Sequence, residues 1–267
     1  MNKSFRGIVE HITHNATNVC FTTSKNKTFG LLLHHIGKNN FKYFMSTIFY
    51  YANGWKQLSD TLLKKSYSSV FVLVDHNTKS HCLSYFDQHF SHPYALLTMD
   101  AGEANKHIGT CEQLWSSMSE QGADRNSLLI NLGGGVVTDL GGFVACTYKR
   151  GIDFINIPTS LLAMVDASVG GKTGVDFHGL KNQIGIIREP VFVVIDDSFL
   201  TTLPSNEFRS GYAEMLKHGL IADADYFSNL ATEKLNEKST ISNHIRHSVE
   251  IKLSLIHISE PTRPIHI

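Results

Sequence analysis

The residues with the clearest chemical potential are three successive glycines, Gly133-Gly134-Gly135, followed by Val136 to Gly142 (VVTDLGG). Successive glycines let a backbone approach a pyrophosphate, and the amides at a helix N-terminus favour its negative charge. The spacing departs from the Gly-x-Gly-x-x-Gly fingerprint, because Thr138 stands where the third glycine would be. The run predicts a nucleotide-binding turn; the alternative is a tight strand-to-helix turn with close helix packing at Gly141-Gly142.

A second glycine loop, from Val169 to Gly174, contains Lys172. Its spacing does not fit an ATP-binding P-loop, because Val165-Asp166 lie where the first glycine would be. A lysine on such a loop can still hold a phosphate or carboxylate as a point charge, and Lys181-Asn182 could add donors to the same anion. The alternative is a solvated hairpin tip.

Glu214 and Lys217 are separated by three residues on a predicted helix. Both point away from the apolar stripe of that helix, which contains Phe208 and Met215. Taken alone, such a pair is a surface ion pair that contributes on the order of a few tenths of a kcal/mol.

The elements that must position these residues alternate between strand and helix patterns. The predicted strands are 48–51, 69–74, 94–99, 127–131, 154–157 and 191–195, and the predicted helices are 55–65, 78–90, 106–121, 138–148 and 161–168. This alternation predicts an α/β fold with a mostly parallel, Rossmann-like sheet. After Pro204 the strands stop, and the segments 205–220 and 226–253 have helical patterns.

We expect four regions. They are an extension of uncertain status (1–44), an α/β domain that binds a nucleotide (45–203), a partial helical domain (204–254) and a tail (255–267). The tail contains Pro261 and Pro264. We expect that it does not continue the preceding helix and that it is not native.

Composition excludes several classes of protein. Lys+Arg and Asp+Glu balance at 24 each, so no basic surface for nucleic acid is indicated. No apolar run reaches the roughly 18 residues of a membrane-spanning helix. The four cysteines form no Cys-x-x-Cys pair, which is typical of free thiols in the reducing cytoplasm.

Longer motifs in fixed order from Gly133 to Gly219 resemble 3-dehydroquinate synthase, a member of the sugar phosphate cyclase group. They are GGGVVTDLGGFVACTYKRG, IPTSLLAMVDASVGGKTGVDF, LKNQIG and FLTTLPSNEFRSGYAEMLKHGLI, with VLVDHNT and GEANK upstream. The resemblance implies an enzyme of the shikimate pathway that converts 3-deoxy-D-arabino-heptulosonate 7-phosphate into 3-dehydroquinate and phosphate. It also implies catalytic NAD and a divalent metal, zinc or cobalt.

The resemblance assigns roles residue by residue. Residues implied to bind the cofactor are Asp75, Asn77, Glu103, Lys106, Gly134, Gly135, Asp139, Arg150, Thr159, Ser160, Asp166 and Thr202. Among these, the first four would contact the adenosine side, and Asp166 would line the join with the substrate. Residues implied to act on the substrate are Lys172, Lys181, Asn182, Lys217 and Lys252. Glu214 would be a metal ligand.

The family's other two metal ligands are histidines downstream of Lys252, and neither His257 nor His266 has the expected setting. We therefore expect a truncated chain that binds NAD weakly and turns over little or not at all. The full-length enzyme is expected to be a homodimer. The alternatives are another NAD- and metal-dependent cyclase, a polyol dehydrogenase, or an inactive NAD-binding fragment.

Overall fold

A computed structural model describes residues 47–232 and 238–259, within the unit Ser46–Ile267. The predicted extension 1–44 lies outside these residues, as does 260–267 of the predicted tail. Within the described residues, no helix is long and apolar enough to cross a membrane.

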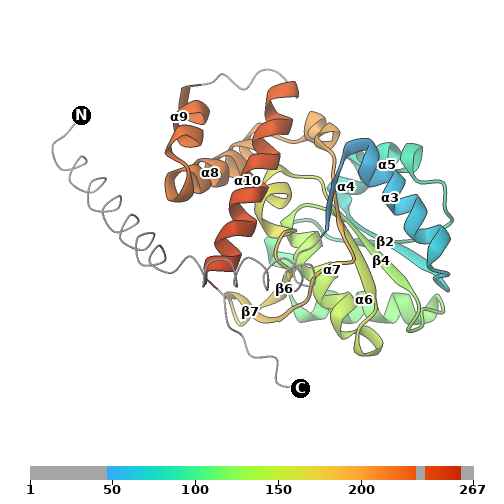
Figure 1. Cartoon of the computed structure of the whole chain (residues 1–267). Coiled ribbons are helices and arrows are strands. Elements are labelled where there is room, and N and C mark those ends of the chain that lie inside the picture. Colours follow the sequence, from blue (N-terminus) through green and yellow to red (C-terminus); the bar gives the residue numbers. More distant parts are fainter. Residues whose placement is uncertain (1–46, 233–237, 260–267) are drawn as a thin grey trace, which may run out of the picture. The chain divides into compact units, whose positions relative to one another are not determined.

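A six-stranded sheet forms the centre of the unit, and every neighbouring pair of strands is parallel (Figure 1). The strand order is β1-β8-β5-β4-β2-β3. The strands are β1 Ile48–Tyr50, β2 Val70–Asp75, β3 Ala95–Met99, β4 Leu128–Gly133, β5 Asp153–Pro158 and β8 Val193–Ile195. The predicted parallel α/β fold is thus confirmed.

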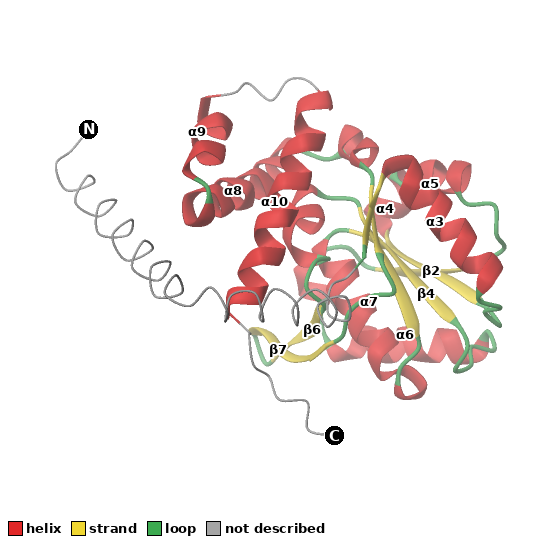
Figure 2. Ribbon diagram, viewed as in Figure 1, coloured by secondary structure: helices red, strands yellow, loops and turns green. Residues whose placement is uncertain are grey.

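Helices cover both faces of the sheet (Figure 2), so the central strands form continuous apolar runs. Val70, Val72 and Val74 of β2 join one core, and Phe71 and Leu73 join the other. The first core is closed by α3 (Tyr51–Lys64), α5 (Leu83–His89) and the C-terminal helices, and the second by α6 (Ile108–Glu120) and α7 (Gly135–Thr147). Short helices connect these elements: η2 Glu103–Asn105, η3 Tyr148–Arg150, η4 Ala163–Ala167 and η5 Asp197–Thr202.

One predicted helix was wrong, and one pair of strands was not predicted. The single helix expected over 78–90 is two helices, α4 (His76–His81) and α5, which meet at Cys82. The first helix begins earlier than expected because Asp75 caps it, accepting a hydrogen bond from the Thr78 amide at 2.7 Å. The glycine loop near Lys172 opens an antiparallel hairpin of β6 (Lys172–Phe177) and β7 (Leu180–Ile187). Because β7 is exposed along most of its length, it lacks the apolar alternation that marks a strand.

Three helices follow the sheet: α8 Ser205–Ala222, α9 Ala224–Thr232 and α10 Lys238–Ser259. The prediction that the helix stops before residue 255 was wrong, because α10 continues to Ser259. Leu253 and Leu255 pack against the first core, and this burial extends the helix beyond its sequence pattern.

Helix α7 approaches both the sheet and the hairpin more closely than a side chain would allow. A Cβ atom on Gly141 would lie 2.1 Å from Asn131 Oδ1 and 2.9 Å from Leu73 Cδ2, and one on Gly142 would lie 2.5 Å from Thr173 Cγ2. Asn131 is fully buried in β4. Glycine at these two positions therefore sets the distance between α7 and its neighbours.

We predict that Gly141→Ala lowers the free energy of unfolding by about 1–3 kcal/mol, because the added methyl overlaps buried atoms that cannot move aside. Gly109→Ala in α6 is the control, since its Cβ would meet the exposed ring of His107 at 3.2 Å. Urea unfolding of both variants provides the measurement. Equal stability of the two variants would contradict the proposed packing constraint.

Candidate functional site

The glycine turn lies where β4 meets α7, at the carboxyl edge of the sheet. Gly133 ends β4, Gly134 is the N-cap of α7, and no side chain caps the helix. Ligands of open α/β sheets bind at this edge where the strand order reverses. Here β2 pairs with β3 on one side and with β4 on the other.

Space, rather than backbone conformation, explains two of the glycines. A Cβ atom on Gly133 would lie 2.5 Å from Val137 Cβ, and one on Gly135 would lie 3.3 Å from Ala167 Cβ. Gly134 has an extended backbone with φ of −73°, which any residue can adopt, and a Cβ there would make an ordinary contact with Ser160 Oγ at 3.4 Å. The bare turn and the uncapped amides of α7 leave room and donors for a pyrophosphate.

A cavity of about 450 Å³ adjoins this turn. Charged and polar side chains from five elements line it: Asp139 of α7, Asp166 of η4, Lys172 of β6, Asn182 of β7 and Lys252 of α10. Lys172 follows Gly170 and Gly171, which have φ of +94° and +65°, a region that favours glycine. The cavity thus unites residues that the resemblance places on the cofactor and on the substrate.

Lys106 lies deep beside this cavity. Its ammonium donates to Asp139 Oδ2 at 2.6 Å and to Asn182 Oδ1 at 2.7 Å. Burial raises the pKa of Asp139 to about 6, while the Lys106 ammonium opposes that shift. The resemblance placed Lys106 on the adenosine side, whereas its Nζ points to the residues that line the cavity.

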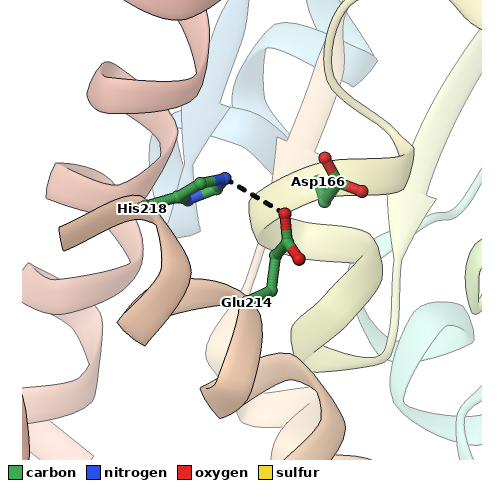
Figure 3. Close-up of side chains that lie close together, drawn as sticks. All are labelled: Asp166, Glu214 and His218. Carbon is green, nitrogen blue, oxygen red and sulfur yellow. Dashed lines mark ion pairs between the residues drawn. The ribbon is translucent and has the colours of Figure 1, made fainter. Parts of the chain in front are cut away.

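Glu214 lies in a cluster with Asp166 and His218, in which one ligand atom of each lies within 4.8 Å of the others (Figure 3). The interpretation of Glu214 as part of a surface ion pair was incomplete: it does pair with Lys217, but its side chain is 14% exposed. Its Oε1 lies 3.3 Å from His218 Nε2, and no hydrogen bond of good geometry from a described residue reaches this buried oxygen.

His218 was not among the site residues predicted from the sequence. Its side chain is 1% exposed, and burial lowers its pKa, so the imidazole is neutral near neutral pH. Its Nδ1 lies 2.7 Å from Ser248 Oγ of α10. The i,i+4 spacing from Glu214 was the available signal, because it places both side chains on one helix face.

Asp166 joins the two parts of the site. It belongs to the Glu214 cluster, lines the cavity and forms an ion pair with Lys252. The side chains that could hold a divalent cation are therefore continuous with the cavity that contains the lysines.

The residues assigned to the adenosine side follow neighbouring strands. Asp75 ends β2 and its Oδ1 accepts from Thr78, while Asn77 is exposed on α4. Glu103 follows β3 and pairs with Lys181 at 3.1 Å, so these two residues interact across the expected boundary between cofactor and substrate.

Thr159 and Ser160 follow β5, and the Thr159 amide donates to the Gly133 carbonyl at 3.0 Å, which places them beside the turn. Thr202 ends η5. Arg150 follows the C-terminus of α7, about 20 Å from the turn at 1.5 Å per residue. The structure therefore does not bring Arg150 to the turn of its own chain.

Comparison with known families gives a match between residues 96–210 and the model for the 3-dehydroquinate synthase N-terminal region. A 3-dehydroquinate synthase from Parabacteroides distasonis is 43% identical over 203 residues, which cover 75% of this chain and 58% of the relative. One from Sulfurovum sp. is 47% identical over 165 residues, covering 62% and 47%. The chain thus spans about half the length of these curated relatives.

Solved structures of sugar phosphate cyclases have the same fold. ValA, a 2-epi-5-epi-valiolone synthase from Streptomyces hygroscopicus with NAD+ and Zn2+ bound, is 28% identical with a TM-score of 0.66, covering 78% of this chain and 60% of that one. A 2-deoxy-scyllo-inosose synthase in complex with carbaglucose-6-phosphate, NAD+ and Co2+ is 20% identical with a TM-score of 0.67, covering 79% and 62%. Over residues 96–210 the chain matches the N-terminal region of 3-dehydroquinate synthases, and its similarity to the Parabacteroides distasonis enzyme extends over 203 residues.

Proposed function

We propose that this protein acts as a cytoplasmic 3-dehydroquinate synthase, which releases phosphate from 3-deoxy-D-arabino-heptulosonate 7-phosphate with NAD and a divalent metal. The observation that carries the proposal is the cavity beside the glycine turn. It presents lysines and an asparagine to a ligand, and Asp166 connects it to the Glu214 cluster. Such an arrangement suits an anionic substrate held between a dinucleotide and a metal.

The residues around the turn fit NAD. The backbone of Gly134 and Gly135 would receive the pyrophosphate, and Asp75 retains Oδ2 for a ribose hydroxyl, because its contacts with Thr78 use Oδ1. When bound, NAD supplies a reversible hydride acceptor and a divalent metal supplies a Lewis acid. The NAD+ and Zn2+ of the ValA structure support this pair of cofactors.

The lysines would bind the substrate anion. Lys172 makes no ion pair with a described residue, so its charge is available to the cavity. Lys252 is held by Asp166, which fixes its ammonium at the cavity wall. Their charges would neutralise the phosphate and carboxylate of the substrate.

The cluster fits a divalent metal. Two carboxylates and a neutral imidazole are donors that zinc and cobalt accept. Glu214 Oε1 pairs with Lys217 and lies 3.3 Å from His218 Nε2, so a bound ion would take the place of the Lys217 ammonium at this oxygen. We propose Glu214 as a ligand, with Asp166 and His218 as the neighbouring donors.

Titration calorimetry with the heptulosonate phosphate in the presence of NAD tests the substrate assignment. We predict that Lys172→Met weakens binding by roughly ten- to a hundredfold, because a charge-assisted contact contributes about 1.5–3 kcal/mol. Lys56→Met, on exposed α3, is the matched control and should bind as the unchanged protein does. Equal affinity in all three proteins would contradict the proposal. If the protein turns over, 3-dehydroquinate should form; accumulation of NADH with a polyol would instead indicate a dehydrogenase.

Cobalt binding tests the metal assignment, because bound Co2+ has visible absorption that reports its ligands. Glu214→Gln should weaken Co2+ binding about tenfold or more, since it removes the anionic donor. Glu207→Gln on the exposed first turn of the same helix is the control. The assignment fails if both variants give the spectrum and affinity of the unchanged protein.

Asp139 should make the stability of the protein depend on pH. Its folded-state pKa of about 6 lies above the ordinary value of 3.8, so between these values the folded protein retains a proton that the unfolded chain has released. The free energy of unfolding therefore falls as the pH rises through this window.

Asp139→Asn lacks this decrease. Relative to the unchanged protein, the variant should gain roughly 2 kcal/mol in unfolding free energy between about pH 4 and pH 7. Urea unfolding of both proteins at several pH values measures the difference. A difference that stays constant with pH would contradict the elevated pKa of Asp139.

A further inference from the structure

The β6–β7 hairpin is attached to the rest of the molecule through Lys106. The ammonium of Lys106, whose side chain is 4% exposed, lies between Asp139 on α7 and Asn182 on β7. The Lys106 carbonyl also accepts from the Asp176 amide at 2.8 Å. One residue therefore contacts the strand that begins the hairpin, the strand that returns, and the helix that follows the glycine turn.

Asn182 is held in an unusual conformation. Its φ is +54°, which a non-glycine residue adopts at a cost. Its amide donates to Asp176 Oδ1 at 2.8 Å within the hairpin, and its side-chain oxygen accepts from Lys106. The contact of its backbone amide and the contact of its side-chain oxygen together fix Asn182 at the cavity wall.

The contact with Lys106 decides which end of the Asn182 side chain faces a ligand. An ammonium has donors and no acceptor, so it must bind the side-chain oxygen of an asparagine. The side-chain NH2 then remains to donate. Asn182 lines the cavity, and its NH2 has no partner among the described residues.

We infer that Lys106 acts as a positioning residue for Asn182. It fixes the hairpin and turns Asn182 so that the amide presents donors to an anionic oxygen of the substrate. Without Lys106 the amide is free to present its oxygen, which repels an anion. The orientation of the Asn182 amide toward the substrate rests on the proposed function, whereas the attachment of the hairpin by Lys106 does not.

The neighbouring ion pair provides an internal contrast. Lys181 pairs with Glu103 at 3.1 Å across the same junction, but its side chain is 72% exposed. An exposed pair contributes little because water and salt screen it. Lys181→Met is therefore a matched control that removes a lysine from the same hairpin without removing the Lys106–Asn182 hydrogen bond.

The test is a double-mutant cycle of Lys106→Met and Asn182→Gly; glycine tolerates the positive φ. In the absence of ligand, each single variant should increase amide hydrogen exchange across residues 172–187 about tenfold. The double variant should show no more than the larger single effect, because the Lys106–Asn182 hydrogen bond is lost in each single variant already. Lys181→Met should change exchange less than about twofold. Independent, multiplying effects of the two changes would overturn the coupling.

Affinity for the heptulosonate phosphate, measured on the same variants, tests the orientation of the amide. Lys106→Met and Asn182→Gly should each weaken it about tenfold, and the pair together no further. Normal affinity in Lys106→Met would overturn the positioning role. If the unchanged protein does not bind this compound, the proposed function fails, while hydrogen exchange still decides the hairpin coupling.

If Lys106→Met does not fold, the rate at which an acylating reagent modifies the Lys106 amine provides the test instead. The Lys106 amine should be unreactive in the unchanged protein and become at least about tenfold more reactive in Asn182→Gly. Equal reactivity of Lys106 in these two proteins would show that Asn182 does not hold it.

Discussion

The close packing of α7 positions most of the site. Gly141 lies against Asn131 of the sheet, and Gly142 lies against Thr173 of the hairpin. This contact fixes the N-terminal turn at the carboxyl edge of the sheet and holds β6 beside Asp139. A side chain at either glycine would separate α7 from the sheet or from the hairpin. Glycine at both positions therefore keeps Asp139 of α7 close to the hairpin strands that line the cavity.

Opposite charges are then arranged in pairs around that cavity. Lys106 with Asp139, Lys252 with Asp166 and Lys217 with Glu214 each place a cation beside a carboxylate. Such pairing offsets the cost of desolvating these groups, and Lys172 remains as a cation for a ligand. The carboxylates of Asp166 and Glu214 also lie close enough to His218 to share a cation. The site thus combines features suited to an anion and to a metal within one connected space.

The sequence predicted the sheet well, because buried parallel strands form continuous apolar runs between glycine-rich turns. It failed at the β6–β7 hairpin, whose exposed strand β7 has no apolar periodicity. The site residues came from motif resemblance, and the structure brings most of them together. Arg150 is the exception, since it follows the far end of α7. The contacts of Lys106, and that of His218 with Ser248, could not be predicted, because they join elements that are distant in the sequence.

The central claim is that the bare turn at Gly134-Gly135 receives a dinucleotide beside the lysine-lined cavity. Backbone amide NMR during titration with NAD tests it most directly. The account predicts saturable shifts at Gly134, Gly135 and Thr159, together with Asn77 after the neighbouring strand. The claim would be contradicted by shifts only at the opposite, amino-terminal edge of the sheet. It would also be contradicted by the absence of any shift at millimolar NAD.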